Sequence, residues 1–305
     1  MATTHLAKAR YENINDEFYT RYEDVEAELK HYRLVGRTVL CPCDTEQSAF
    51  VQYFKKNFAK LKIKELWYTY LGADVVYIYD GHTTNTWQCP YIDCTNGNLL
   101  NSCNIVITNP PFSLYKQMFE AIRVSFILVT SLHKLTIKSV AKRVLAGKCR
   151  LGYNAISQFI LPDGTLQKFG NTYWLTTSPV KYVKPHDYAD KLTMQKYYNL
   201  DCIFVSRVSA IVFDYYDPMA VPLTFLYGFP YEDFEILGLT VGSSWNDINK
   251  IKTTPIKSVK VYETDELINK LADKAMLPNE SGKYLLNDSV RADNPFIRLV
   301  IRRKR

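Results

Sequence analysis

The chain has 305 residues, of which 47% are hydrophobic and 23% charged, with a formal net charge of +7 at pH 7. That balance is ordinary for a soluble globular protein and long enough for one large domain or two modest ones. No run of about 18 apolar residues occurs, which excludes a predicted membrane-spanning helix. The first residues lack the apolar block of a secretory signal, so we expect a cytoplasmic protein.

Seven cysteines stand at positions 41, 43, 89, 94, 103, 149 and 202. None of them forms a Cys-x2-Cys pair, and no His pair lies near, so the spacing does not predict a zinc site. An odd number of cysteines without a secretory signal also argues against a disulfide framework. We expect free thiols that are buried or line a site, and no metal.

The N-terminal part of the chain predicts a helix, a strand and a second helix. Asp16 can cap a helix over residues 16–33, because the apolar positions there alternate four and three apart and share one face. Residues 37–41 form a short apolar strand that ends at Pro42. Residues 48–61 have the pattern of an amphipathic helix.

The middle of the chain alternates between predicted strands and helices. The strands are expected at residues 63–69, 74–79, 87–92, 105–108 and 126–130, and the helices at 114–123 and 134–145. This alternation predicts an α/β fold, a doubly wound and mostly parallel sheet wrapped by helices.

After residue 150 the pattern becomes strand-rich and irregular, with strands expected at residues 157–161, 173–176, 202–205 and 296–301. We therefore predict two parts, a core over residues 1–177 and a strand-rich C-terminal region over residues 178–305.

Four residues, Asn109, Pro110, Pro111 and Phe112, directly follow the strand expected at residues 105–108. The prolines end that strand because neither can donate to a sheet hydrogen bond. What remains is a rigid elbow at the carboxyl end of a strand, the edge where open α/β sheets bind ligands. A simple turn after a strand is the alternative interpretation of Asn-Pro-Pro.

The elbow has the groups needed to hold a flat, weakly nucleophilic amine. The side-chain oxygen of Asn109 and the carbonyl of Pro110 are acceptors for two amine hydrogens, and Phe112 is a stacking surface. Such acceptors push the nitrogen towards tetrahedral geometry and stabilise the positive charge that it gains on attack. The predicted chemistry is therefore transfer of a group to a planar amine.

A donor for that reaction must bind at the same sheet edge. Cys41, Pro42, Cys43 and Asp44 end the first strand and precede a helix, the usual position of a nucleotide-like cofactor. No glycine-rich turn is present, which disfavours NAD and ATP. The segment tolerates a cofactor without phosphates, such as S-adenosylmethionine.

Two further segments are candidates for the cofactor site. Asp93 can accept a hydrogen bond from an adenine amine, with a turn carboxylate beside Asn96 as the alternative. Tyr19 and Thr20, with Phe18, can close over the cofactor, and packing at the start of a helix is the alternative there.

The tetrapeptide at residues 109–112 resembles the catalytic motif of N6-adenine methyltransferases that use S-adenosylmethionine. More narrowly, the chain resembles the EcoRI-type adenine-specific DNA methyltransferases. The segments that support this likeness lie at residues 16–28, 41–44, 104–114, 173–177, 221–225 and 296–303, and so reach both ends of the chain.

The resemblance implies a role for each matching position. Asn109, Pro110 and Phe112 would hold and stack a flipped-out adenine, and residues 41–44 would line the methionine side of the cofactor. Asp93 would bind the adenine of the cofactor, and Tyr19 and Thr20 would form its outer wall. The region over residues 178–305 would recognise the target.

Two departures from the family pattern concern the cofactor. Most adenine methyltransferases have an acidic residue where Cys41 stands and a glycine soon after it. In addition, no acidic residue ends the strand near residues 67–70, which leaves the ribose-binding residue unassigned.

A stretch after Ser178 combines positive charge with aromatic surface. Lys181, Lys184, Lys191 and Lys196 are interleaved with tyrosines at positions 182, 188, 197 and 198. These two properties together are typical of nucleic-acid contacts, so we predict DNA binding there. A solvated face is the commoner alternative for this stretch, as it is for the basic clusters at residues 250–260 and 298–305.

The sequence therefore predicts a site-specific DNA adenine N6-methyltransferase. It would transfer methyl from S-adenosylmethionine to a flipped-out adenine in double-stranded DNA, as a monomer and without a metal. Restriction-modification, with a cognate endonuclease that forms no stable complex, and phage or orphan modification are the expected settings. Two alternatives stay open: methylation of RNA bases or protein glutamine at the same elbow, and a catalytically inactive DNA-binding homologue.

Overall fold

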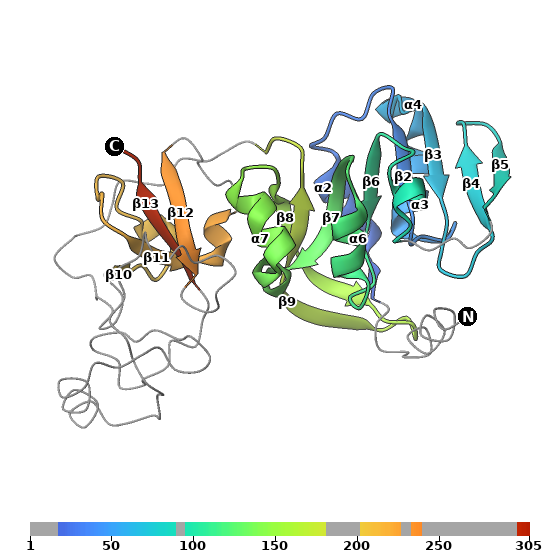
Figure 1. The fold of residues 1–305 in the computed structure, drawn as a ribbon. Helices are drawn as coiled ribbons and strands as arrows, with labels where there is room; N and C mark the ends of the chain where they lie inside the picture. Colours follow the sequence, from blue (N-terminus) through green and yellow to red (C-terminus); the bar gives the residue numbers. More distant parts are fainter. Residues whose placement is uncertain (1–17, 90–94, 181–201, 227–232, 240–297) are drawn as a thin grey trace, which may run out of the picture. The chain divides into compact units, whose positions relative to one another are not determined.

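The computed structural model describes residues 18–89, 95–180, 202–226, 233–239 and 298–305 (Figure 1). The chain divides into two compact units, one of residues 1–134 and 148–180 and the other of residues 135–147 and 181–305. Within the described ranges, no helix is long and apolar enough to cross a membrane. The predicted division into a core over residues 1–177 and a strand-rich C-terminal region over residues 178–305 stays a prediction.

The first unit is built on a nine-stranded sheet with the order β1-β8-β9-β7-β6-β2-β3-β4-β5. Figure 1 shows the succession from β7 through β6, β2, β3 and β4 to β5. Its strands are β1 (Tyr19–Thr20), β2 (Thr38–Cys41), β3 (Glu65–Tyr68), β4 (Val75–Tyr79), β5 (Thr84–Gln88), β6 (Ile105–Thr108), β7 (Ser125–Ser131), β8 (Arg150–Ile160) and β9 (Leu166–Thr176). Its helices are α2 (Tyr22–Leu29), α3 (Ala49–Lys56), α4 (Phe58–Leu61), α5 (Gly97–Leu100) and α6 (Tyr115–Ala121).

The sheet is parallel at its centre and antiparallel on both sides. The strands β7, β6, β2 and β3 are parallel neighbours. The β4–β5 hairpin adds to β3 in the antiparallel direction, and the β8–β9 hairpin does the same at β7. The α/β class is confirmed, but the sheet as a whole is mixed, because hairpins rather than crossovers extend it on each side.

The order of the central strands reverses between β2 and β6. The chain passes from β2 through α3 to β3 on one side, and from β6 through α6 to β7 on the other. Such a reversal leaves a crevice at the carboxyl ends of the two inner strands, which is where open α/β sheets bind ligands. The strand predicted at residues 105–108 is β6, so the proline elbow lies at this crevice.

Both faces of the central strands are buried, as a doubly covered sheet requires. Val39, Ile105 and Ile127 belong to one cluster with apolar residues of α2 and α3. Side chains alternate along a strand, so Phe126 lies on the opposite face, where its ring packs against Phe119 of α6 at 5.5 Å between centroids.

Three predicted helices are shorter than the sequence pattern suggests. The first begins at Tyr22, because residues 19–20 pair with β8 as strand β1 instead; its predicted cap, Asp16, lies outside the described residues. The second is divided at Asn57, whose side chain donates to the carbonyl of Tyr53 at 2.9 Å and competes with the helix. The third splits into the 3-10 helix η1 (Leu132–Thr136) and α7 (Lys138–Leu145).

A buried carboxylate joins α2 to an irregularity in β8. Glu28 is fully buried and accepts hydrogen bonds from Tyr32 Oη at 2.6 Å and from the backbone N–H of Tyr153 and Asn154, each at 2.8 Å. The register of β8 against β9 shifts at this point, so these two N–H groups turn to the carboxylate. The clamp fixes α2, and with it strand β1, against the sheet.

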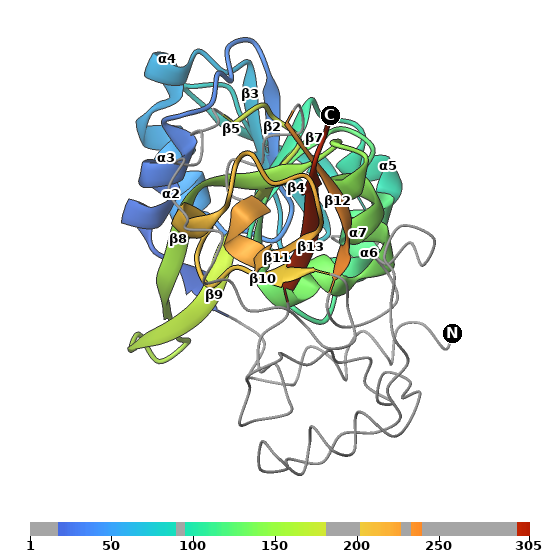
Figure 2. The same cartoon turned by 90° about the vertical axis from the view of Figure 1, so that its left-hand side faces the viewer.

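The second unit contains a four-stranded sheet with the order β10-β11-β13-β12 (Figure 2). The unit also contains α7, and its other elements are β10 (Ile203–Phe204), η3 (Val208–Ala210), β11 (Met219–Pro222), η4 (Leu223–Leu226), β12 (Phe234–Leu239) and β13 (Arg298–Arg303). Two C-terminal arginines have structural partners here: Arg298 donates to the carbonyl of Val205 at 2.8 Å, and Arg302 pairs with Glu235 at 2.6 Å.

A substitution at Gly152 tests how much the hydrogen bonds of Glu28 between α2 and β8 contribute to stability. A Cβ atom at this position would overlap Glu28 Oε1 and lie 2.8 Å from Trp174 Cβ, so we expect Gly152→Ala to lower the free energy of unfolding by about 1–3 kcal/mol. Gly170→Ala is the control, because a Cβ on Gly170 meets nothing within 4 Å. Urea denaturation measures both variants; equal effects would contradict the clamp.

Candidate active site

The elbow after β6 and the loop after β2 share a pocket of about 600 Å³ at the carboxyl edge of the sheet. The residues that line it are Phe18, Tyr19, Thr20, Tyr22, Cys43, Asp44, Thr45, Gln47, Ser48, Ala49, Phe50, Gln52, Tyr70, Leu71, Asn109, Pro110, Pro111, Phe112 and Ile160. All of them belong to the first unit. The pocket therefore brings together three segments that are far apart in the sequence, at residues 18–22, 43–52 and 109–112.

The side-chain amide of Asn109 has a defined orientation. Its Nδ2 donates to the backbone carbonyl of Phe18 at 2.7 Å, and a carbonyl can accept only from the NH₂ side of an amide. Oδ1 is therefore the free end of the side chain, and no described residue donates to it. Asn109 offers the pocket an acceptor.

Aromatic rings hold the wall opposite the elbow. The ring of Phe18 packs against that of Phe112, at 5.4 Å between centroids, and against that of Phe169 of β9 at 4.6 Å. Phe169 in turn contacts Phe159 of β8. The β8–β9 hairpin thus supports the segment that faces the elbow at residues 109–112.

Asp44 connects the carboxyl ends of three parallel strands. Its carboxylate accepts from Thr108 Oγ1, at the end of β6, at 2.7 Å, and its N–H donates to the carbonyl of Thr69, after β3, at 2.8 Å. Thr69 N–H donates to the carbonyl of Cys41, the last residue of β2, at 3.1 Å. These bonds set the loop after β2 against the elbow after β6.

The Asp44 carboxyl is only 5% exposed, yet it faces the pocket. Burial raises its pKa to about 7, although the hydrogen bonds from Thr108 and Ser48 lower it. Ser48 also caps α3 by accepting from Val51 N–H at 3.3 Å. A carboxyl held in this way is suited to pair with a cationic group of a ligand, which would restore its charged form.

Two hydroxyl groups of the pocket wall lack hydrogen-bond partners. The Thr20 Oγ1 and Tyr22 Oη atoms are buried, and no described group bonds to either. Buried hydroxyls without partners are unfavourable, and a ligand in the pocket is one source of the missing bonds. Both residues line the pocket beside Asp44 and Gln52.

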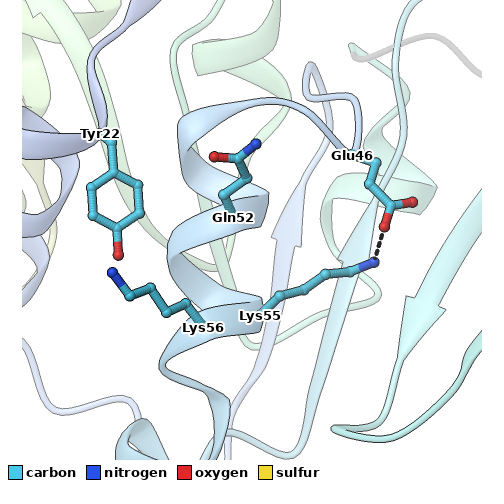
Figure 3. Close-up of a pocket in the computed structure, with 5 residues that line it drawn as sticks. All are labelled: Tyr22, Glu46, Gln52, Lys55 and Lys56. Atoms are coloured by element: carbon cyan, nitrogen blue, oxygen red, sulfur yellow. Dashed lines mark hydrogen bonds and ion pairs between the residues drawn. The ribbon is translucent and has the colours of Figure 1, made fainter.

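A second, shallower groove of about 500 Å³ adjoins the pocket along α3 and is lined by Tyr22, Glu46, Gln52, Lys55 and Lys56 (Figure 3). Lys55 pairs with Glu46 at 2.6 Å (Figure 3), while the ammonium of Lys56 lies 5.1 Å from the centre of the Tyr22 ring. Tyr22 and Gln52 line both hollows, so the groove continues the pocket over the surface of α3.

Most of the predicted site residues that the structure describes meet in the pocket: Tyr19, Thr20, Cys43, Asp44, Asn109, Pro110, Pro111 and Phe112. Cys41 and Pro42 are buried and are not among the lining residues; the side chain of Cys41 packs in the core cluster. Asp93 and the lysines at positions 181, 184, 191 and 196 lie outside the described residues. Among the described residues, no group of three His, Cys, Asp or Glu could hold a metal ion.

The comparison with protein families gives a match to the family described as "Adenine-specific methyltransferase EcoRI", over residues 5–98 and 92–304. The chain belongs to this family. The match runs through both units and includes the elbow, the loop after β2 and the described C-terminal sheet.

Three curated relatives are similar to the chain over most of its length. Type II methyltransferase M.EcoRI of Escherichia coli is 28% identical over 304 residues, which cover 81% of this chain and 93% of the relative. Type II methyltransferase M.MpnI of Mycoplasma pneumoniae is 30% identical over 266 residues, which cover 73% and 82%. M.MgeORF184P of Mycoplasma genitalium is 24% identical over 294 residues, which cover 82% and 90%.

Sequence reasoning missed the part of the pocket that comes from β3 and α3. Tyr70 and Leu71 line it shortly after β3, close to the position left without a ribose-binding residue, and Gln52 lines it from α3. The position of Tyr70 and Leu71 after a strand parallel to β2 indicates that they lie at the pocket, because the carboxyl ends of parallel neighbours share one edge of the sheet.

Asp44 gives the protein a distinctive dependence on pH. Its folded pKa of about 7 lies above that of an unfolded carboxyl, so the native state holds an extra proton between about pH 4 and pH 7. Stability from this group is present below that window and is lost as the pH rises, by up to about 1.4 kcal/mol per unit. Urea titrations from pH 4 to pH 8 should show this fall in the wild type relative to Asp44→Asn; parallel curves would contradict it.

Proposed function

We propose that this protein is a site-specific DNA methyltransferase that transfers a methyl group from S-adenosylmethionine to N6 of an adenine in double-stranded DNA. The observation that carries the proposal is the fixed amide of Asn109. Its donor end is occupied by the Phe18 carbonyl, so an acceptor is presented beside the Pro110 carbonyl at the pocket. Membership of the adenine-specific EcoRI family supports adenine as the acceptor.

The pocket fits S-adenosylmethionine. Its volume of about 600 Å³ lies in the range of small-molecule sites, roughly 300–1,000 Å³. The Asp44 carboxylate suits the ammonium group of the methionine part, and the unpartnered hydroxyls of Thr20 and Tyr22 suit its polar oxygens. Tyr70 provides aromatic surface after β3. The cofactor would supply a methyl group activated by a sulfonium.

The elbow residues would act on the base. Asn109 Oδ1 and the Pro110 carbonyl would accept the two hydrogens of the adenine amine, favouring the pyramidal nitrogen and the positive charge of the transition state. Phe112 would stack on the base, a contact worth about 1–3 kcal/mol. No strong general base is needed, because the amine proton becomes acidic once the nitrogen is alkylated.

The reaction requires the adenine to leave the duplex, because N6 is inaccessible to the pocket while the base is stacked. In our proposal the region over residues 178–305 recognises the target sequence, and the lysines at positions 181, 184, 191 and 196 contact phosphates. The relatives are named Type II methyltransferases, which favours a restriction-modification role over RNA or protein methylation. We further propose that the protein acts as a monomer in the cytoplasm, independent of any endonuclease complex.

Methylation of unmodified plasmid DNA by the purified protein, followed by sequencing that detects modified adenines, tests the function and maps the site. Asn109→Ala should lower kcat by about 100-fold or more and leave cofactor binding in place, since it removes the acceptor of the amine. Asn98→Ala, at an exposed position of α5, is the control. Full activity of Asn109→Ala would reject the mechanism, and methyl transfer only to RNA or protein would reject the substrate.

Thr20→Val tests the cofactor site because it should affect stability and cofactor affinity in opposite directions. Valine has the shape of threonine without the hydroxyl, so the free protein should be as stable as the wild type or more so in urea. Affinity for S-adenosylmethionine, measured by calorimetry, should fall about fivefold because a ligand hydrogen bond is lost. Unchanged affinity would place the ligand elsewhere.

A further inference from the structure

Lys134 lies beside the catalytic elbow although it is 22 residues away from Phe112 in the sequence. It belongs to η1, which directly follows β7, and β7 is the parallel neighbour of β6. Its ammonium donates to the backbone carbonyl of Phe112 at 3.0 Å. The same nitrogen lies 5.9 Å from the centre of the Phe112 ring and 5.6 Å from that of Tyr115.

The charge of Lys134 is not balanced by a carboxylate in the part of the chain that the structure describes. Lys55, by contrast, pairs with Glu46 at 2.6 Å. The sequence around Lys134 contains no Asp or Glu between Glu120 and Asp163. An ammonium has three N–H donors, of which the Phe112 carbonyl takes one, so two donors and the full charge remain for an anion.

The position of Lys134 favours an anion of the methyl acceptor over one of the cofactor. Lys134 contacts the loop from the Phe112 side and is not among the residues that line the pocket with Asp44. The carboxylate of S-adenosylmethionine would bind inside that pocket. The acceptor, a nucleotide whose base stacks on Phe112, carries its phosphates outside the pocket.

The chemistry of the reaction also calls for an anion at this point. Alkylation puts positive charge on a base that lies against Phe112, and a bare ammonium near that ring opposes the charge. A phosphate bound to Lys134 would cancel the repulsion and leave the hydrogen bond to the Phe112 carbonyl intact. Bound DNA would thereby supply the negative charge that offsets Lys134 during its own methylation.

We propose that Lys134 binds a DNA backbone phosphate next to the extruded adenosine while it holds the Phe112 carbonyl, so that it couples strand binding to the position of the catalytic elbow. This inference rests on the proposed function and adds a phosphate contact and a positioning residue to it.

The test uses a duplex that carries the methylation site mapped for the wild type. Lys134→Met keeps the packing over the two rings but removes charge and donors, and Lys134→Arg restores both. In Lys134→Met we expect kcat/KM for DNA to fall on the order of tenfold. The slope of log affinity against log salt should become shallower by about one. Lys134→Arg should recover most of both, and calorimetric affinity for S-adenosylmethionine should stay unchanged.

Lys116→Met is the matched control, because Lys116 is an exposed lysine of α6 close in sequence to the elbow. An unchanged salt slope in Lys134→Met, or an equal change in Lys116→Met, overturns the inference and leaves the proposed function standing. A loss of cofactor affinity in Lys134→Met overturns it as well, since the anion would then be the cofactor carboxylate. A wild type that neither binds nor methylates duplex DNA overturns both.

Discussion

The hydrogen bond from Thr108 to the Asp44 carboxylate, 2.7 Å long and buried, is the contact on which the geometry of the site depends. Thr108 ends β6, and Asp44 lies in the loop after β2. The order of the sheet reverses between these two strands, so the bond spans the crevice of the fold. The loop after β2 has no glycine-rich turn to shape it. The side chain of Asp44 and its backbone bond to Thr69 take over that role, which explains how the loop after β2 keeps its place.

The wall of the pocket that faces the elbow is positioned by contacts of α2, β1 and the β8–β9 hairpin. Glu28 fastens α2 to the irregular part of β8, and residues 19–20 pair with the end of the same strand. Phe18, held by this pairing and by Phe169, then presents its carbonyl to Asn109. The orientation of one amide thus depends on a hairpin whose first strand begins at Arg150, 38 residues after Phe112. A substitution in that hairpin away from Ile160, which lines the pocket, would therefore act on the Asn109 amide from a distance.

Local sequence patterns predicted the parts of the fold that depend on neighbours along the chain. The strand at residues 105–108, its proline elbow and the amphipathic helix after Ser48 follow from apolar runs and breakers, and all three are present. Residues 19–20 were assigned to a helix because their pairing with β8 involves a partner about 140 residues away. The contact between Lys134 and Phe112 was missed for the same reason. The sequence does show, however, that no Asp or Glu lies between Glu120 and Asp163, which indicates a positive charge without a nearby carboxylate along the chain.

The proline after Asn109 has a consequence for the chemical lifetime of the site. Asparagine side chains in loops deamidate when the backbone nitrogen of the next residue attacks the amide and closes a five-membered imide. That nitrogen belongs to Pro110, which has no N–H and cannot form the imide. The residue that would turn into a carboxylate in an ageing protein, and so lose its donor to Phe18, is therefore protected by the rigid ring that follows it.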